Sequence, residues 1–176
     1  DGRKIAFTGY LENELSDYSL PLLHPPIGEE SVIRSFSKEW LDYNWNPEKY
    51  WKIDSEYMYR SMRFMLNLEN IPIKNMQVLE VGIGIGGIAN SISSRESCEL
   101  IGIDLSYAVD AAYKNFQRNL FFHIVQASAF RLPFKENTFD YVYSQGVLHH
   151  SSDPKQCFVN VSKKTKKGGH LYVWFY

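Results

Sequence analysis

Cysteine is scarce in this chain, and long apolar runs are absent. Cys98 and Cys157 are the two cysteines in 176 residues, too few and too far apart for a disulfide framework or a zinc cluster. There is no run of about 18 apolar residues, so a membrane-spanning helix is not expected. No apolar signal core follows the polar start, residues 1–4. We therefore expect a protein of a reducing compartment, the cytoplasm, with no bound metal and no membrane partner.

A surplus of either charge is also lacking. Nineteen Lys and Arg against twenty Asp and Glu give a formal net charge of −1. A chain without a basic field has little attraction for nucleic acid or anionic lipid. Four lysines gather between Lys163 and Lys167, at the end of a predicted helix, where positive charge suits the helix dipole. The charge balance therefore predicts no nucleic-acid partner.

Aromatic residues, in contrast, are plentiful and clustered. They make up 15% of the chain, and three of the four tryptophans lie between Phe36 and Trp51. Aromatics at this density build a small core or wall a pocket. The stretch from Pro21 to Pro26 contains three prolines, which predicts that it forms an extended arm before the aromatic cluster. We expect residues 1–72 to form an aromatic-rich arm and helical cap. We also expect most of its aromatics to pack onto the following domain rather than close over a ligand, including Phe36, Trp40, Tyr43 and Trp51.

Helix and strand patterns alternate along the chain. Apolar spacing predicts two helices in the cap, over 31–43 and 55–68, the second with a buried methionine stripe. After Pro72, the alternation with short connections predicts a parallel sheet wound with helices on both faces, over residues 73–176. The expected strands are 77–81, 99–103, 121–126, 139–144 and 170–176, and the expected helices are 85–94, 106–119 and 153–164.

The two ends of the chain support one further interpretation. The sequence opens on Asp1 rather than Met and stops on the apolar run 171–176. That run has no turn signal after it and no polar tail. We therefore interpret the chain as a piece of a longer protein.

The most informative stretch is a glycine-rich turn between a buried strand and a helix, Val78 to Gly87. Glycines there let the backbone bend sharply and let a ligand lie against it. Gly82-x-Gly84-x-x-Gly87, with Asp104 about 20 residues further on, fits the fingerprint of a dinucleotide site. By itself, such a match is weak evidence.

A second spacing, Glu80-x-Gly82-x-Gly84-x-Gly86, fits the same turn and adds a carboxylate at the end of the strand. A pyrophosphate would be repelled by Glu80, whereas a ligand with an amino group and a sulfonium would be attracted. Charge therefore favours a sulfonium compound over a dinucleotide.

The turn resembles the first motif of the class I S-adenosylmethionine-dependent methyltransferases. Further stretches resemble the remaining motifs in the family's order: Ile101–Ser106, Gln126–Phe134 with Asn137–Val142, Ser144–His150 and Lys167–Gly169. The resemblance covers residues 76–176 and is closest to the small-molecule type called methyltransferase type 11.

The resemblance implies a fold and a reaction. The fold is a Rossmann-like doubly wound α/β sheet of order 3-2-1-4-5, preceded by the helical cap. Two further strands that family members normally have are missing from this chain. The implied cofactor is S-adenosylmethionine, with S-adenosylhomocysteine as product, and the methyl acceptor is an O, N or C nucleophile of a small molecule.

The resemblance also implies roles for individual residues. Asp104 would accept hydrogen bonds from both ribose hydroxyls, and Glu80 would organise the amino group of the methionine part. Ser128 stands where the family usually has an acid that receives the adenine amino proton, and a hydroxyl is a weaker acceptor. The expected cofactor-binding residues are Arg60, Glu80, Gly82, Ile83, Gly84, Gly86, Asp104, Leu105, Ser128, Ala129, Ser144 and Gln145.

Two further expectations concern basic side chains. Arg60, on the helix before the first strand, would meet the cofactor carboxylate, with Arg63 as the substitute; a solvated surface arginine is the alternative. His149 and His150 are candidates for a general base because histidine titrates near neutral pH. Bonding to backbone groups is the simpler role for both histidines, so no catalytic residue is assigned.

Three other functions remain open from the sequence. A nicotinamide-dependent oxidoreductase using NAD would share the fold. A module that binds S-adenosylmethionine without turnover would share the cofactor. A methyltransferase acting on protein or RNA would differ only in its partner.

Overall fold

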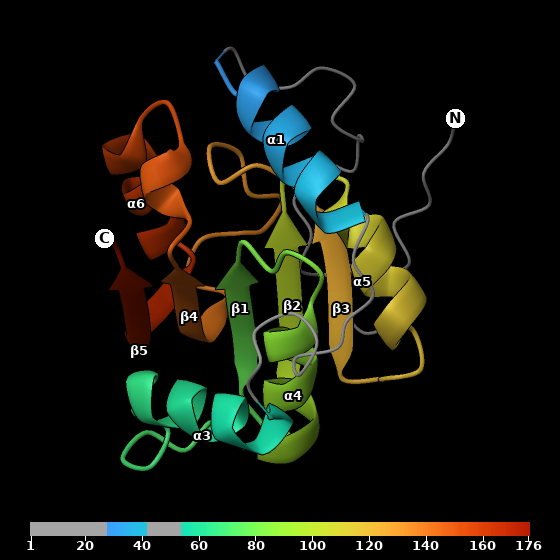
Figure 1. The fold of residues 1–176 in the computed structure, drawn as a ribbon. Helices are drawn as coiled ribbons and strands as arrows, with labels where there is room; N and C mark the ends of the chain where they lie inside the picture. Colours follow the sequence, from blue (N-terminus) through green and yellow to red (C-terminus); the bar gives the residue numbers. More distant parts are fainter. Residues whose placement is uncertain (1–27, 42–53) are drawn as a thin grey trace.

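The computed structural model describes residues 28–41 and 54–176, and Figure 1 shows its course. The elements follow in the order α1 (Glu30–Leu41), α3 (Ser55–Met65), β1 (Gln77–Val81), α4 (Gly87–Glu96), β2 (Glu99–Asp104), α5 (Ala108–Phe116), β3 (Phe122–Gln126), β4 (Phe139–Gln145), η1 (Leu148–His150), α6 (Pro154–Ser162) and β5 (Thr165–Trp174).

The strands form one parallel sheet. Within the described residues it has five strands in the order β3-β2-β1-β4-β5, which confirms the predicted order. The chain winds outward from β1, first to β2 and β3 and then to β4 and β5. The direction reverses between β1 and β4, and ligands of open α/β sheets bind at the carboxyl ends of the strands beside that point.

The two faces of the sheet are covered by different helices. Val78 and Leu79 are neighbours on β1 and point to opposite faces, because side chains alternate along a strand. The face of Val78 packs against apolar residues of α3, α4 and α5, including Met62 and Ile92. The face of Leu79 packs against α6 through Cys157. Helices on both faces bury the sheet, as the alternation predicted.

The last strand begins earlier than expected. The strand was expected over 170–176, but α6 ends at Ser162 and β5 starts at Thr165, so Gly168 and Gly169 lie inside the strand. Gly168 has φ of 79°, and the pairing of β4 with β5 shifts register there. A Cβ on Gly169 would lie 2.8 Å from the carbonyl oxygen of Asp140. The two glycines therefore permit a bulge in the strand.

The caps and the buried stripe of α3 also differ from expectation. Asp54 caps the helix, since its Oδ1 accepts from two backbone N–H groups of the first turn at 2.9 Å, and the helix ends at Met65 rather than at residue 68. Of the predicted methionine stripe, Met62 is buried whereas Met65 is exposed. Helix α3 packs against the sheet through Met62. The domain boundary predicted at residue 72 stays a prediction.

Helix α1 lies across the carboxyl ends of the strands in Figure 1, while α3 lies at the lower end of the picture. The contact of α1 with α5 includes a hydrogen bond from the backbone N of Tyr107, just before α5, to Oγ of Ser37 on α1, at 3.0 Å. This position makes α1 a cover over the edge of the sheet. None of the helices in the described residues has the length and apolar character needed to cross a membrane.

Candidate functional site

A cavity of about 470 Å³ opens at the carboxyl ends of β1, β2 and β4, under α1. This is the switch point that the fold marks for a ligand, and the volume is that of a small-molecule site. Its wall carries three carboxylates, Glu29, Glu80 and Asp104, and no Lys or Arg among the described residues. The arrangement suits a ligand with positive charge and hydrogen-bond donors.

The glycine-rich turn forms one side of the cavity. Gly82 has φ of 88°, and a Cβ there would lie 2.3 Å from Cγ2 of Val147, so no other residue fits without displacing Val147. The backbone N of Gly82 and Ile83 both donate to the carbonyl of Ile103, at 2.8 and 3.0 Å. The end of β1 is thereby tied to the end of β2, with backbone facing the cavity.

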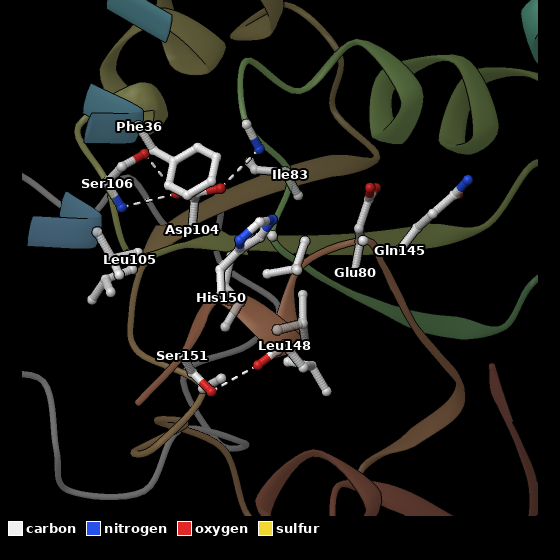
Figure 2. A pocket seen from close by; sticks show the side chains of 18 of the residues that line it. Phe36, Glu80, Ile83, Asp104, Leu105, Ser106, Gln145, Leu148, His150 and Ser151 are labelled. Atoms are coloured by element: carbon white, nitrogen blue, oxygen red, sulfur yellow. Dashed lines mark hydrogen bonds between the residues drawn. The ribbon is translucent and has the colours of Figure 1, made fainter. Parts of the chain in front are cut away.

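Asp104, at the end of β2, organises the turn. Its Oδ2 accepts from the backbone N of Gly84 at 2.8 Å, and its Oδ1 accepts from the N and Oγ of Ser106, at 2.8 and 2.7 Å. Burial raises the pKa of Asp104, although these donors oppose the shift. Oδ1 has both of its acceptor sites in use, whereas Oδ2 keeps further acceptor capacity. Figure 2 shows Asp104 between Ser106 and Ile83.

Glu80 is a buried carboxyl inside the strand, 5% exposed, and it reaches the same cavity. The hydroxyl of Tyr143 on β4 donates to its Oε2 at 2.6 Å. Burial raises the pKa of Glu80 to about 8; the Tyr143 hydrogen bond lowers it, and the charge of Asp104 adds to the rise. A cation brought into the cavity would favour the ionised form.

Most of the predicted cofactor-binding residues meet at this cavity. Figure 2 shows Glu80 and Gln145 on one side and Leu105 on the other, with Asp104 between them. The predicted residues that line the cavity are Glu80, Gly82, Ile83, Gly84, Asp104, Leu105, Ser128, Ala129 and Gln145.

Arg60 does not reach the cavity, which corrects its expected position. Its side chain is 76% exposed on α3 and pairs with Glu56 one turn earlier. Arg63, the substitute, pairs with Glu69 and Glu96 and also lies outside the cavity wall. The physical reason is that α3 packs its apolar face on the sheet beside α4, so its arginines face away from the strand ends.

Ser144 and Gly86 also lie outside the cavity wall. Ser144 is fully buried, and its hydroxyl donates to the carbonyl of Val81 at 3.0 Å, which ties β4 to β1. Gly86 caps α4 with φ of 80°, and a Cβ there would lie 3.0 Å from Cβ of Ala112 on α5. Ser144 therefore ties the strands together behind the turn, and the lack of a side chain at Gly86 lets the start of α4 approach α5.

Of the two histidines in η1, His150 lines the cavity and His149 does not. His150 lies edge-on to Phe36 at 5.2 Å between ring centroids, and its Nε2 is 3.0 Å from the hydroxyl of Tyr176. Both ring nitrogens of His149 are buried with no hydrogen-bond partner among the described residues. Burial lowers the pKa of His149, and the neighbouring His150 adds to this. The geometry favours His150 as the group that meets a ligand.

Sequence reasoning missed one wall of the cavity. Glu29, Phe36 and Trp40 line it from α1 and its start, although the aromatics were expected to pack onto the domain. A Cβ on Gly84 would meet the Trp40 ring at 3.5 Å, so the ring lies directly on the turn. Tyr43 and Trp51, and the proline-rich arm, lie outside the described residues. The sequence pattern that could have indicated this wall is the spacing of residues 29, 36 and 40 on one helix face. Such spacing shows that the face is buried but not what it is buried against.

Known proteins are similar in sequence to a part of this chain. Phosphoethanolamine N-methyltransferase 2 of Caenorhabditis elegans is 29% identical over 104 residues, which are 56% of this chain and 23% of that protein. A sterol 24-C-methyltransferase of Schizosaccharomyces pombe is 30% identical over 106 residues, 56% of this chain and 28% of that protein. The chain spans about a quarter of the length of these two relatives.

A solved structure agrees with these relatives. It is phosphoethanolamine N-methyltransferase 2 of Haemonchus contortus in complex with phosphomonomethylethanolamine and S-adenosylhomocysteine. It has a TM-score of 0.58 and 25% identity to this chain, and the match covers 64% of this chain and 28% of that one.

The methyltransferase domain family matches residues 79–173, more than half of the chain. This span begins inside β1 and ends inside β5, so it contains the glycine-rich turn and Asp104. It also favours the sulfonium reading of the turn over the dinucleotide reading. The chain therefore belongs to the methyltransferase domain family, as its motifs predicted.

Proposed function

We propose that this chain transfers a methyl group from S-adenosylmethionine to an O, N or C nucleophile of a small molecule. The observation that carries the proposal is the pair of buried carboxyls, Glu80 and Asp104, in a cavity whose described residues include no Lys or Arg. A nucleotide with phosphates would be repelled there, whereas a cationic nucleoside with ribose hydroxyls is favoured.

The residues present fit this cofactor. Oε1 of Gln145 is buried with no hydrogen-bond partner among the described residues, and Gln145 lines the cavity on the side of Glu80 (Figure 2). These two groups would take the cofactor's amino group, an assignment supported by the cost of leaving a buried acceptor unpaired. Asp104 would take a ribose hydroxyl through Oδ2, the oxygen that its donors within the chain leave with acceptor capacity.

The cofactor, when bound, supplies a methyl group already activated by the positive charge of its sulfonium. What the chain has to do is hold the acceptor in line with that methyl and keep water out. Phe36, Trp40 and Trp174 supply an apolar wall for this purpose. His150 stays our candidate for accepting a proton from the acceptor, held by its contact with Tyr176.

A small molecule is the acceptor class we propose. Similar proteins are named for phosphoethanolamine and for sterols, and the cavity here is of small-molecule size. Which atom is methylated depends on groups beside the sulfonium.

The proposal is tested by titration calorimetry with S-adenosylhomocysteine on the wild type, Asp104→Asn and Arg60→Ala. We expect Asp104→Asn to lose about a hundredfold in affinity, since hydrogen bonds to charged groups contribute about 1.5–3 kcal/mol each. Arg60→Ala, outside the cavity, is expected to bind within about twofold of the wild type. Equal binding by all three proteins would contradict the role of Asp104.

Turnover separates the remaining alternatives. Transfer of a labelled methyl group into small molecules of a metabolite extract supports the proposal. Tight binding with no labelled product would identify a binding module, and label in protein or RNA would identify a macromolecular acceptor. Either of these two results would overturn the proposed acceptor class.

A further inference from the structure

A third carboxylate in the cavity wall, Glu29, has no role in the chemistry described so far. It precedes the first residue of α1 and is 2% exposed. Its Oε1 accepts from the backbone N of Ser152 at 2.8 Å. Its Oε2 accepts no hydrogen bond from the described part of the chain. This oxygen is not itself fully buried, so a ligand in the cavity can reach it, and it has acceptor capacity to offer a donor.

The helix geometry places Glu29 at one end of the cavity. Glu29, Phe36 and Trp40 lie on one face of α1, and all three line the cavity. Glu29 and Trp40 are separated by about 16 Å along the axis, at 1.5 Å per residue. Trp40 lies against Gly84 of the glycine-rich turn. Glu29 is therefore at the far end from the turn, beside the segment that follows η1.

That end of the cavity has apolar walls. Ala129 and Phe130 pack against the core cluster that contains Leu148 and Cys157. Burial raises the pKa of the Cys157 thiol, and the charge of Glu29 adds to the rise, which indicates that the carboxylate is close to this cluster. In Figure 2, Leu148 and Ser151 lie away from Glu80. A flat apolar ring with a polar edge fits between such walls.

We infer that Oε2 of Glu29 accepts a hydrogen bond from the exocyclic amino group of the cofactor's adenine. The inference rests on the cofactor named under the proposed function. Ser128, at the same end, is a poor alternative, because its Oγ already accepts from the backbone N of Phe130 at 3.1 Å and a hydroxyl is a weaker acceptor than a carboxylate. Glu29 is thus a specificity residue, contributed by the covering helix rather than by the sheet.

The test compares two ligands that differ at this one position of the purine. S-Adenosylhomocysteine carries a 6-amino donor, and S-inosylhomocysteine carries a 6-oxo acceptor. Their affinities are measured by calorimetry for the wild type, Glu29→Gln and the control Glu30→Gln, whose side chain is exposed. The glutamine keeps an acceptor for the N–H of Ser152 and presents an amide N–H₂ toward the ligand.

We expect the wild type and Glu30→Gln to prefer the adenosyl compound by about tenfold or more. Glu29→Gln should lose this preference or reverse it. Glu29→Asp, which keeps the charge but shortens the reach, should weaken adenosyl binding and keep the direction of the preference. This variant provides the comparison if Glu29→Gln does not fold.

Two results would overturn the inference. One is an unchanged preference in Glu29→Gln. The other is an equal loss of both ligands, because that would make Glu29 only an anchor for the loop at Ser152. If the wild type bound neither compound, the proposed function itself would fail, and this inference with it.

Discussion

The two walls of the cavity are built differently. The wall made by the ends of β1 and β2, the strand wall, consists of backbone and the buried carboxyls of Glu80 and Asp104. Hydrogen bonds from Gly82 to the carbonyl of Ile103 and from Gly84 to Asp104 hold it together. The wall made by α1, the helix wall, consists of the side chains of Phe36 and Trp40 on one helix face, with Glu29 at the start of the helix. The first wall leaves little freedom for substitution, whereas the second can change its side chains without changing the fold. From this difference we propose that the strands fix the position of the cofactor and that α1 supplies contacts that can vary.

The largest effect is expected where the strand wall is most crowded. Gly82→Ala should lower the free energy of unfolding by about 3 kcal/mol, since a Cβ at φ of 88° would overlap the side chain of Val147. It should also abolish measurable binding of S-adenosylhomocysteine. Chemical denaturation and calorimetry measure the two effects.

Gly168→Ala is the matched control for this substitution. Gly168 also has positive φ, 79°, but nothing lies within 4 Å of a Cβ there. The substitution Gly168→Ala should lower the free energy of unfolding by about 1 kcal/mol, because only the strain of the left-handed backbone conformation is added. Equal costs at the two glycines would show that the strand wall is less crowded than its geometry indicates.

An intermediate effect, dependent on pH, is expected at Glu80. Because burial raises its pKa to about 8 from 4.5, its contribution to stability is full below pH 4.5 and is lost as pH rises toward 8. Glu80→Gln should therefore melt about 5 °C higher than the wild type at pH 8, with little difference at pH 4.5. Affinity for S-adenosylhomocysteine should rise in the wild type between pH 6 and pH 8 and stay weak and flat in the variant.

Glu136→Gln, an exposed substitution of the same chemistry, is the control and should show neither trend. A melting temperature of Glu80→Gln that follows the wild type at every pH would contradict the shifted ionisation.

The smallest effect is expected on the helix wall. Phe36→Ala should weaken binding of S-adenosylhomocysteine about threefold to tenfold by removing half-buried apolar area beside His150. Its melting temperature should change little. Phe64→Ala on α3, where the ring is 77% exposed, is the control and should alter neither quantity. A lower melting temperature of Phe36→Ala with unchanged affinity would make α1 a packing element, as its sequence suggested.

Position in the sheet explains why parts of the site were predictable and others were not. Glu80, Gly82 and Asp104 occupy a strand–turn–helix unit and the end of the next strand, so their proximity follows from local pattern and parallel pairing. Arg60 and Phe36 both lie on amphipathic helices, and amphipathicity shows which face is buried but not what covers it. Helix α1, expected to pack onto the domain, therefore lines the cavity, whereas Arg60 of α3, expected to meet the cofactor, lies outside it.

By itself, the sequence determined the alternation of strand and helix and hence a parallel sheet, because periodicity and the glycine-rich turn are local properties of the chain. The strand order and the family followed from the resemblance of its motifs to those of the methyltransferases. Tertiary structure alone decided that Glu29 and His150 share a cavity with Asp104, that Ser144 is buried behind it, and that Arg60 faces solvent. These outcomes depend on how α1 and α3 pack against the sheet. Such long-range packing depends on surfaces that only the folded chain brings together.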